Sequence, residues 1–417
     1  MNVIAVGLIL PSLPKTVAEE HIDELSKLIE TSGATVVAKV FAKRPAPDPA
    51  SFIGKGKAEE VKSLAEKHEA TTIIFDDDLS PAQVRNLEKL IGKKVIDRSG
   101  LILDIFAGRA RTREAKTQVE LAQLEYMLPR LTRAWSHLER QAGGAGGGAK
   151  RGVGEQQLEL DRRIVRTRIA RLKEELQRIE KNRETQRKQR EAAFTVALVG
   201  YTNAGKSTMF NRLTQGETLA MDKLFATLDS RTAKIAYEMP RPTVVIDTVG
   251  FIRKLPHHLV ASFRSTMEEA VAADLVLHVI DGSHPQYTEQ REVGDEVLAE
   301  LGVDASRVFE VYNKADRIEE HFEIRRKDAV VVSALTGLRI NRLVEMIRDR
   351  EREGGELLTL EIPHADSRTL ARLHELAEIQ EQATNDDGAL VTAWVPNDSV
   401  HLFKEFVARP AKTRRSA

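Results

Sequence analysis

In the N-terminal part of the chain, short runs of hydrophobic residues alternate with segments in which hydrophobic residues recur every three or four positions. Four short apolar runs are typical of buried β-strands, and they lie at residues 2–10, 34–41, 71–77 and 93–98. Three segments between them repeat apolar side chains every three or four positions, as helices do; these are residues 16–32, 57–70 and 80–92. Strands separated by helices predict a parallel α/β domain, which we expect to span residues 1–108.

Two apolar ladders follow, each with the 3–4 spacing of a heptad seam. The first comprises Leu121, Leu124, Leu128, Leu131, Trp135 and Leu138, and the second comprises Leu158, Val165, Ile169, Leu172, Leu176 and Ile179. They flank a glycine-rich stretch at residues 141–154, so we expect an antiparallel helical hairpin over residues 109–192. Pro129 is expected to kink the first arm, and the second arm is expected to begin near Glu155.

The remaining chain divides into two further parts. Residues 193–352 alternate strands, loops and helices. Residues 353–417 predict a small α+β domain, with strands at 357–362 and 389–395 flanking a helix at 367–383.

Charge and composition narrow the classes of protein. The 417 residues carry no net charge and no cysteine, so disulfides are excluded and a reducing, cytoplasmic compartment is expected. The apolar start is interpreted as a strand and not a signal peptide, and no run is long enough for a membrane span. Residues 109–192 nevertheless hold 21 Lys and Arg against 12 Asp and Glu. A basic helical segment favours a nucleic-acid partner, and the alternative is a solvated helical surface.

A phosphate-binding motif follows the apolar strand at residues 195–199. Its spacing, G-x-x-x-x-G-K-S, lets backbone N–H groups surround phosphate oxygens while a lysine reaches the β and γ phosphates. The expected phosphate-binding residues are Gly200, Tyr201, Thr202, Asn203, Ala204, Gly205, Lys206, Ser207 and Thr208.

A D-x-x-G motif follows at residues 247–250. Ser207, Asp247 and a switch threonine would hold Mg²⁺, and the Gly250 amide would face the γ phosphate. Thr227 is the preferred threonine and Thr232 is the alternative. The switch residues are expected to be Phe225, Ala226, Thr227, Leu228, Asp247, Thr248, Val249, Gly250 and Phe251.

Two later motifs predict that guanine is the base. The Asp316 carboxylate would accept hydrogen bonds from two guanine donors, a pair that adenine lacks. Asn313 would brace its loop, and the Lys314 stem could cover the base. Ser333, Ala334 and Leu335 occupy the position of a second guanine-contacting loop. The ligand is therefore expected to be GTP or GDP.

Two positions carry finer predictions. Phe251 stands where many Ras-like proteins have a water-orienting glutamine, so hydrolysis by the protein alone is expected to be slow. Asn203 resembles the asparagine of potassium-stimulated GTPases, which implies a K⁺ site; the alternative is an ordinary loop residue.

The order of these blocks resembles the HflX family of translation-associated GTPases. The similar segments include residues 52–61, 75–89 and 97–131, together with the GTP-binding motifs. We therefore expect a multidomain α/β protein with an N-terminal α/β domain, a helical hairpin, a P-loop Ras-like GTPase domain and a small C-terminal α+β domain. A structural coiled-coil protein with a decayed nucleotide site is disfavoured by the intact motifs.

The resemblance implies a partner and a role for the hairpin. It implies binding to the large ribosomal subunit in the GTP state, dissociation of ribosomes after stress, and a hairpin tip near the peptidyl-transferase RNA. The alternative is an assembly or anti-association factor that does not split ribosomes. The expected RNA-contacting residues are Gly143, Gly144, Gly146, Gly147, Gly148, Lys150, Arg151, Gly152, Gly154 and Gln156. Gln156 departs from the small hydroxyl residue usual in the family. The protein is expected to be a monomer.

Three consecutive aspartates at residues 76–78 suggest a metal site. A solvated strand end that leads to a helix cap at Ser80 is the preferred interpretation.

Overall fold

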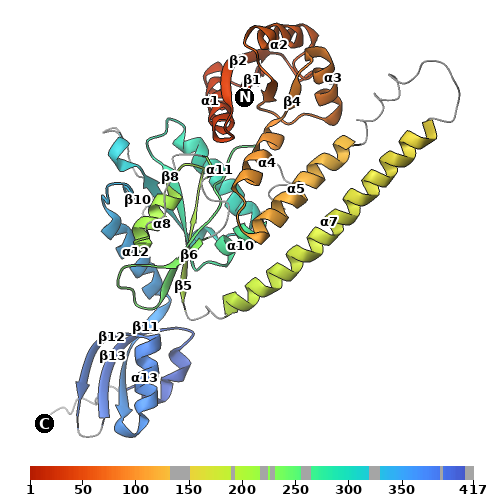
Figure 1. Ribbon diagram of the computed structural model, residues 1–417. Coiled ribbons are helices and arrows are strands. Elements are labelled where there is room, and N and C mark those ends of the chain that lie inside the picture. Colours follow the sequence, from red (N-terminus) through yellow and green to blue (C-terminus); the bar gives the residue numbers. More distant parts are fainter. Residues whose placement is uncertain are drawn as a thin grey trace, which may run out of the picture. The chain divides into compact units, whose positions relative to one another are not determined.

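The computed structural model describes residues 1–131, 151–188, 193–216, 224–225, 231–254, 264–318, 329–385 and 388–408 (Figure 1). The chain divides into two compact units. The first contains residues 1–183, 221–229 and 249–267. The second contains residues 184–220, 230–248 and 268–417. The chain therefore passes between the units several times, and the boundary at residue 249 falls within the D-x-x-G motif.

The first unit is built on a four-stranded sheet. Its strands are β1 (Asn2–Ile9), β2 (Thr35–Lys43), β3 (Thr72–Phe75) and β4 (Lys94–Ile96), in the order β2-β1-β3-β4 and all parallel. Helices α1 (Lys15–Thr31), α2 (Lys55–Lys67) and α3 (Pro81–Ile91) connect them. The expected parallel α/β architecture is confirmed. Its core gathers the side chains of the alternating apolar runs, among them Ile4, Val6 and Phe75, which are almost fully buried.

The turn into α3 follows the predicted capping chemistry. The Ser80 hydroxyl accepts from the backbone N–H of Gln83, whose side chain accepts from the Ser80 N–H, and Pro81 is the first helical residue. The interpretation of residues 76–78 as a solvated strand end is wrong at its first position. Asp76 is only 3% exposed, because it forms an ion pair with the buried Arg98. Among the described residues no cluster with the composition of a metal site occurs.

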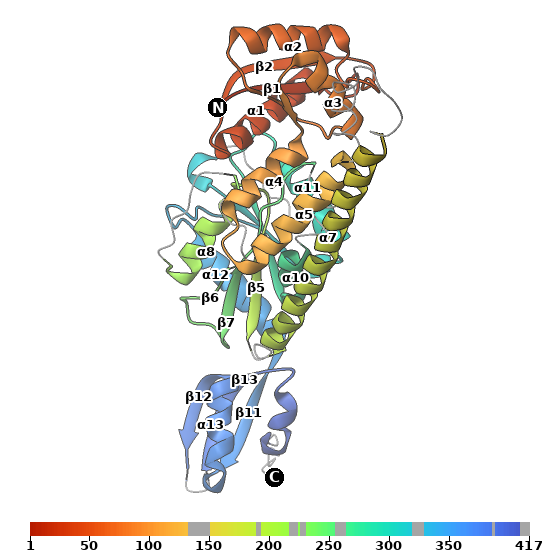
Figure 2. The same cartoon turned by 45° about the vertical axis from the view of Figure 1, so that its right-hand side comes forward.

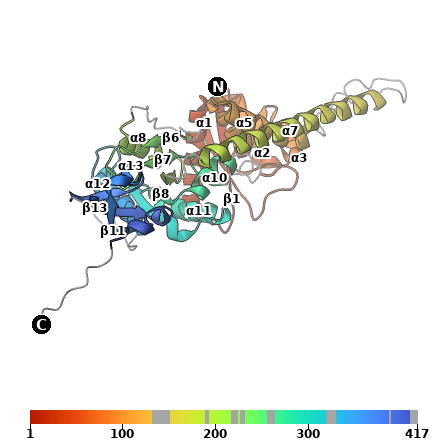
Figure 3. The same ribbon diagram turned by 90° about the horizontal axis from the view of Figure 1, so that it is seen from below.

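Three further helices follow, of which the third continues beyond residue 183 into the second unit. Helix α4 (Arg98–Arg109) begins at an Asp97 cap, and α5 (Arg113–Leu131) and α7 (Arg151–Lys188) follow. The pairs Arg113–Glu175 and Arg168–Glu120 join α5 to α7 in antiparallel order, as the hairpin prediction requires. Leu172 of the second ladder is buried. Figure 3 shows α7 as a long, straight helix. At about 1.5 Å per residue, its 38 residues span about 57 Å.

The second arm begins earlier than expected. Helix α7 starts at Arg151, so Arg151, Gly152, Gly154 and Gln156 have helical backbone where a loop edge was expected. Each glycine lowers helix stability by about 1 kcal/mol relative to alanine, and propagation from a long helix can offset that cost. The other expected tip residues, Gly143, Gly144, Gly146, Gly147, Gly148 and Lys150, lie outside the described residues.

The second unit holds a six-stranded sheet in the order β10-β9-β8-β5-β7-β6. These strands are β5 (Phe194–Val199), β6 (Arg231–Lys234), β7 (Thr243–Asp247), β8 (Leu275–Asp281), β9 (Val308–Asn313) and β10 (Ala329–Val331). Only β6 is antiparallel to its neighbour. The strand order reverses at β5, where ligands of open α/β sheets bind. The accompanying helices are α8 (Lys206–Thr214), α10 (Arg264–Ala272), α11 (Tyr287–Glu300) and α12 (Ile340–Glu353).

A small antiparallel sheet ends the described chain. It has the order β11-β13-β12, from β11 (Gly355–Pro363), β12 (Glu378–Thr384) and β13 (Gly388–Pro396), and α13 (Ser367–Leu376) packs on one face (Figure 2). The helix predicted over 367–383 is wrong in its second half, because α13 ends at Leu376 and β12 follows. Backbone pairing of β12 with β13 determines this strand, and a local sequence window cannot show that partner. None of the described helices combines the length and the apolar character needed to cross a membrane.

Candidate nucleotide-binding site

The loop between β5 and α8 requires glycine at both motif positions. Gly200 and Gly205 have φ angles of +144° and +94°, which side chains rarely tolerate. A Cβ atom on Gly200 would lie 2.0 Å from the Val279 carbonyl oxygen, and one on Gly205 would lie 2.2 Å from Asn313 Nδ2. The close approach of β8 and β9 to this loop therefore explains the glycines without reference to a ligand.

Lys206 begins α8 and is directed into the same loop. Its Nζ atom donates to the carbonyl oxygens of Gly200 and Tyr201, at 2.9 Å in each case. Burial lowers the Lys206 pKa to about 8, while the nearby Asp247 carboxylate opposes that shift. The ammonium group thus lies against two carbonyl groups of the loop, where it would neutralise phosphate charge.

The other expected phosphate-binding residues lie on the same loop and helix. Tyr201, Thr202 and Ala204 are buried, whereas Asn203 is exposed. Thr208 lies in the first turn of α8. The backbone of Asn203 is left-handed, with φ +62°, a conformation that asparagine tolerates better than most residues. This preference gives Asn203 a conformational reason to be there.

The two expected metal ligands from the P-loop and D-x-x-G motifs lie together. The Ser207 hydroxyl donates to Asp247 Oδ2 at 3.0 Å, and Asp247 is fully buried at the end of β7. The Thr248 hydroxyl donates to the Leu198 carbonyl at 2.7 Å, which holds the end of β7 against β5. One hydroxyl and one carboxylate fit Mg²⁺, which commonly takes one or two protein oxygens and completes its shell with phosphate and water.

The switch residues are only partly described. Ala226, Thr227 and Leu228 lie outside the described residues, and the alternative threonine, Thr232, lies in β6 opposite Ile246. Phe225, Val249, Gly250 and Phe251 are buried, and all belong to the first compact unit. The P-loop residues are assigned to the second compact unit.

Asn313 and Asp316 organise the expected guanine loops. Asn313 Nδ2 donates to the Ala204 carbonyl, and its Oδ1 accepts from the Ala334 N–H, both at 2.9 Å. The Ser333 hydroxyl donates to Asp316 Oδ1 at 2.5 Å. Three separate motifs therefore meet, and the hydroxyl of the second guanine loop orients the carboxylate of the first.

Two further side chains, Leu335 and Lys314, belong to the expected guanine loops. Leu335 is 64% exposed beside them. Lys314 has a φ of +63°, and its Nζ lies 2.7 Å from Asp281 Oδ2. Asp281 ends β8 and also accepts from the Ser283 hydroxyl, so it fixes the direction of the lysine stem.

Arg212 is a residue of the site that the sequence motifs did not reveal. From α8 it donates to the carbonyl oxygens of Ala334 and Leu335, at 3.0 and 2.5 Å. Its acceptors are backbone atoms more than a hundred residues away, so no side-chain pattern announces them. The sequence offers one local indication of this role, which is that Arg212 follows Lys206 by six residues on the same helix.

The fold and this loop constellation define a class. P-loop GTPases have a parallel sheet with one antiparallel edge strand and a P-loop after its central strand. They also carry the D-x-x-G and N-K-x-D motifs at the ends of later strands. The chain is such an enzyme, a GTP-binding protein that hydrolyses GTP.

Comparison with known proteins identifies the family. Residues 19–107, 109–190 and 195–314 match families described as GTP-binding GTPase N-terminal, GTP-binding GTPase Middle Region and 50S ribosome-binding GTPase. A "GTPase HflX" of Magnetococcus marinus is 44% identical over 385 residues, covering 90% of this chain and 88% of that protein. The "GTPase HflX" of Escherichia coli is 44% identical over 382 residues, covering 89% and 88%. The chain belongs to the HflX family of GTPases, as its sequence motifs predicted.

A solved structure is also similar. It is a GTP-binding protein from Sulfolobus solfataricus in complex with GDP, with 25% sequence identity and a TM-score of 0.45, covering 84% of this chain and 98% of that one.

Proposed function

We propose that this GTPase binds the large ribosomal subunit in its GTP state and dissociates stalled or stress-damaged ribosomes. GTP hydrolysis then releases it. The observation that supports the proposal is that one HflX chain combines the sequence motifs of a GTP-binding site with a basic helical hairpin. Residues 109–192 carry 21 Lys and Arg against 12 Asp and Glu, which suits a phosphate-rich RNA surface. The family description that matches residues 195–314 also names the 50S ribosome.

Within the nucleotide site, each motif has a proposed role. Lys206 and the backbone N–H groups of the P-loop hold the phosphates, and Ser207 and Asp247 hold Mg²⁺ with Thr227. Bound Mg²⁺ neutralises charge on the phosphate oxygens. Asp316 selects guanine, since a carboxylate facing adenine would lose its hydrogen bonds in a buried setting. Arg212 and Asn313 position the second guanine loop through its backbone.

Hydrolysis by the protein alone is proposed to be slow. Phe251 follows the D-x-x-G motif, is 2% exposed, and offers no hydrogen bond to an attacking water. A partner or a bound cation must then supply the missing orientation. The ribosome is the proposed partner, and the protein acts in the cytoplasm as a monomer.

Potassium is the proposed cation, with Asn203 as its P-loop ligand. A GTPase rate several times higher in KCl than in NaCl at equal ionic strength would support this site, and the Asn203→Ser variant should lose the difference. Equal rates in the two salts would leave Asn203 with the conformational role that its left-handed backbone provides.

One experiment separates ribosome splitting from an assembly or anti-association role. Purified whole ribosomes are mixed with the protein and a non-hydrolysable GTP analogue, and the mixture is sedimented through a gradient. Free subunits, with the protein comigrating with the large one, are expected. Comigration with large subunits but no loss of whole ribosomes would favour the assembly role. The Lys206→Ala variant is the matched control, because it keeps the hairpin and loses tight GTP binding.

A further inference from the structure

The two ends of the segment at residues 97–131 meet around one buried carboxylate. Asp97 caps α4 and is fully buried, and Tyr126 and Arg130 lie near the end of α5. The Tyr126 hydroxyl donates to Asp97 Oδ1 and Arg130 Nη2 donates to Asp97 Oδ2, at 2.6 Å in each case. These three residues, here called the Asp97 clamp, belong to the first compact unit. The clamp therefore attaches the far end of the first hairpin arm to the N-terminal domain.

Backbone groups of the N-terminal domain surround the same carboxylate. The Leu79 N–H donates to Asp97 Oδ2 at 3.2 Å, and the Gly100 N–H donates to Oδ1 at 2.9 Å. The Leu79 carbonyl in turn accepts from Arg130 Nη2 at 3.2 Å. Leu79 follows β3, an interior strand of the sheet, so the clamp joins α5 to the sheet as well as to α4. Movement of α5 would leave a buried carboxylate without two of its donors, which is costly.

The shape of the junction is adapted to the Tyr126 hydroxyl. A Cβ atom on Gly100 would lie 2.8 Å from Tyr126 Oη. Burial raises the Tyr126 pKa, and the Asp97 carboxylate raises it further, so the hydroxyl keeps its proton and can donate. The Arg130 guanidinium lies over the Tyr126 ring, 3.5 Å from its centre, in a cation–π contact. The two side chains of α5 therefore hold each other as well as the carboxylate.

The clamp lies at a weak part of α5. Pro129 is inside the helix and has no N–H to donate to the preceding turn. Arg130 Nη1 donates to the Tyr126 carbonyl at 2.9 Å, which supports this turn. The buried side chains of α5 end at Ala122, four residues before Tyr126. The clamp thus holds the turns of α5 that side-chain burial secures least.

The second arm is joined to the first along the same stretch. Arg168 and Lys173 of α7 pair with Glu120 and Glu125 of α5, at 2.7 and 2.8 Å. Each exposed pair contributes little alone, but together with the buried Leu172 they keep the arms parallel to one axis. A first arm fixed at Asp97 therefore also fixes the direction of α7.

We propose that Asp97, Tyr126 and Arg130 are positioning residues, through which the N-terminal domain sets the direction of the hairpin before it meets the large ribosomal subunit. The inference rests on the proposed function, because the subunit is the proposed partner of the hairpin. An arm already held in one direction loses less conformational freedom on binding, which strengthens binding. The clamp then determines how tightly the subunit is bound, and not how fast the bound protein hydrolyses GTP.

A distance measurement in the full-length protein tests the direction of the hairpin. The chain has no cysteine, so Lys62→Cys on α2 and Arg163→Cys on α7, both exposed positions, accept one spin label each. Pulsed electron paramagnetic resonance gives the distribution of distances between the labels. Arg130→Ala should broaden this distribution, because the buried Asp97 loses its ionic partner.

Further variants in the labelled protein test the clamp from other sides. Tyr126→Phe, which removes one hydroxyl, and Gly100→Ala, which crowds that hydroxyl, should each broaden the distribution less than Arg130→Ala. Arg130→Lys should recover most of the narrow distribution. The matched control is Lys116→Ala, which removes an exposed cation from the same helix and should leave the distribution unchanged.

A titration with large ribosomal subunits tests the consequence for function. Arg130→Ala should raise the subunit concentration that gives half-maximal stimulation of GTP hydrolysis about three- to tenfold, the effect of ordering one or two side chains on binding. The maximal rate and the affinity for GDP should not change, whereas a misfolded variant would lose both. If Arg130→Ala misfolds, Tyr126→Phe and Gly100→Ala decide in its place.

The outcomes separate the clamp from the proposed function. If the distance distribution is equally narrow in wild type and in the folded clamp variants, packing of α5 on α4 suffices and the proposal is overturned. Equal broadening by Lys116→Ala would overturn it as well. If the distribution broadens but the half-saturating subunit concentration is unchanged, the positioning role is overturned. If large subunits do not stimulate the wild type, the proposed function fails, and the distance measurement alone decides whether Asp97 holds the arm.

Discussion

The Asp316 carboxylate is the residue on which base selection is proposed to depend. The Ser333 hydroxyl donates to one of its oxygens, and this loop is in turn fixed by Asn313 and Arg212. In this proposal, selectivity depends on a carboxylate that Ser333 orients directly and that Asn313 and Arg212 support through the Ser333 loop. It is a property of the connected loops more than of one motif.

Asp316→Asn is expected to exchange the base preference. An amide would present one donor and one acceptor, which suits xanthine better than guanine. Affinity for GTP should fall about 10- to 100-fold, the magnitude of a lost charge-assisted hydrogen bond. Competition binding with XDP and GDP measures the exchange. A variant that retains its preference for GDP would show that another group selects the base.

Arg212→Ala is expected to weaken guanine nucleotide binding without touching the phosphate loop. The guanidinium holds two carbonyls of the second guanine loop, so its loss should lower GDP affinity about fivefold, chiefly by faster dissociation. Stopped-flow release of a fluorescent GDP measures it. Arg212→Lys, which can hold one carbonyl, should be intermediate. Arg212 is proposed to act only where the guanine base binds. Inorganic phosphate should therefore bind the phosphate loop of the variant and of the wild type with equal affinity.

At the scale of the element, α12 carries a buried acid against the β6–β7 connection. Glu351 is fully buried and accepts from the Arg241 N–H at 3.1 Å, and Thr243 lies beside it. Burial raises the Glu351 pKa to about 7, and the nearby Arg241 guanidinium opposes the shift while Glu378 adds to it. Helix α12 thus packs by way of a carboxyl group that holds a proton in mildly acidic solution.

This group gives stability a defined pH dependence. Between its ordinary pKa and about 7, the folded chain keeps the Glu351 proton and the unfolded chain releases it. Unfolding then releases a proton, so this contribution to stability falls as pH rises through that window and is lost above it. Glu351→Gln should gain several degrees in Tm relative to wild type between pH 5 and pH 8. The fluorescence of Trp394, whose indole donates to the Arg352 carbonyl on the same helix, reports the transition in a Trp135→Phe background. A constant difference in Tm across this range would contradict the assignment.

Elements with local signals were predictable from the sequence, and elements defined by distant partners were not. The α3 cap depends on neighbours within one turn, and the structure reproduces it. In the described parts of the two heptad seams, Leu121 and Leu172 are buried. Strand β12 forms because it pairs with β13, and the role of Arg212 depends on carbonyl groups of another loop. The residues next to β12 or Arg212 in the sequence therefore do not reveal these partners. Asp76 was misread for the same reason, since its partner Arg98 lies in a helix that the periodicity did not predict.

At the scale of the whole molecule, the proposed function divides between a GTP site and a hairpin. The two arms are predicted to meet at a glycine-rich tip, and glycine permits close approach to RNA. The nucleotide site would then control when the protein binds and leaves the ribosome, and the hairpin would recognise ribosomal RNA.

Replacing the glycines of residues 143–148 with alanine should separate these roles. GTP affinity should stay within about twofold of wild type, while splitting in the sedimentation assay falls sharply. Replacing the same number of residues on the exposed face of α7 is the control. Undiminished splitting would reduce the segment to a connector.

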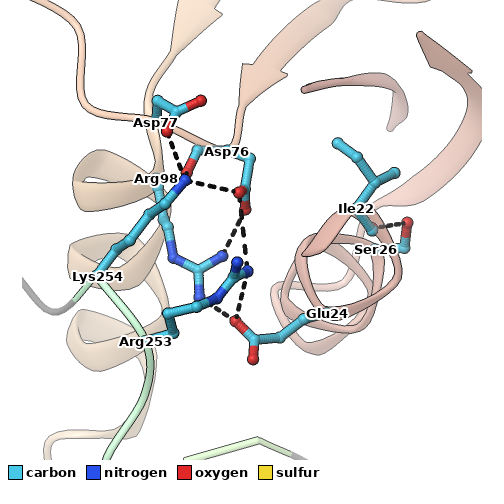
Figure 4. A network of polar contacts seen from close by, with 8 residues as sticks. All are labelled: Ile22, Glu24, Ser26, Asp76, Asp77, Arg98, Arg253 and Lys254. Carbon is cyan, nitrogen blue, oxygen red and sulfur yellow. Dashed lines mark hydrogen bonds and ion pairs between the residues drawn. The ribbon is translucent and has the colours of Figure 1, made fainter. Parts of the chain in front are cut away.

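Lys254 Nζ lies 3.1 Å from Asp76 Oδ2, and the wide separation of these two residues along the chain has a consequence for synthesis. The two residues are 178 positions apart, so the N-terminal sheet leaves the ribosome long before its partner cations exist. At about 5–20 residues per second, the interval is about 10–35 s. During that time Asp76 and Glu24 can pair with Arg98, whereas Arg253 and Lys254 are not yet made (Figure 4). The early domain must then fold with an incomplete set of ion pairs. A fragment ending near residue 190 should therefore be less stable than the same domain in the finished chain. A nascent chain paused at this length would be expected to bind chaperones.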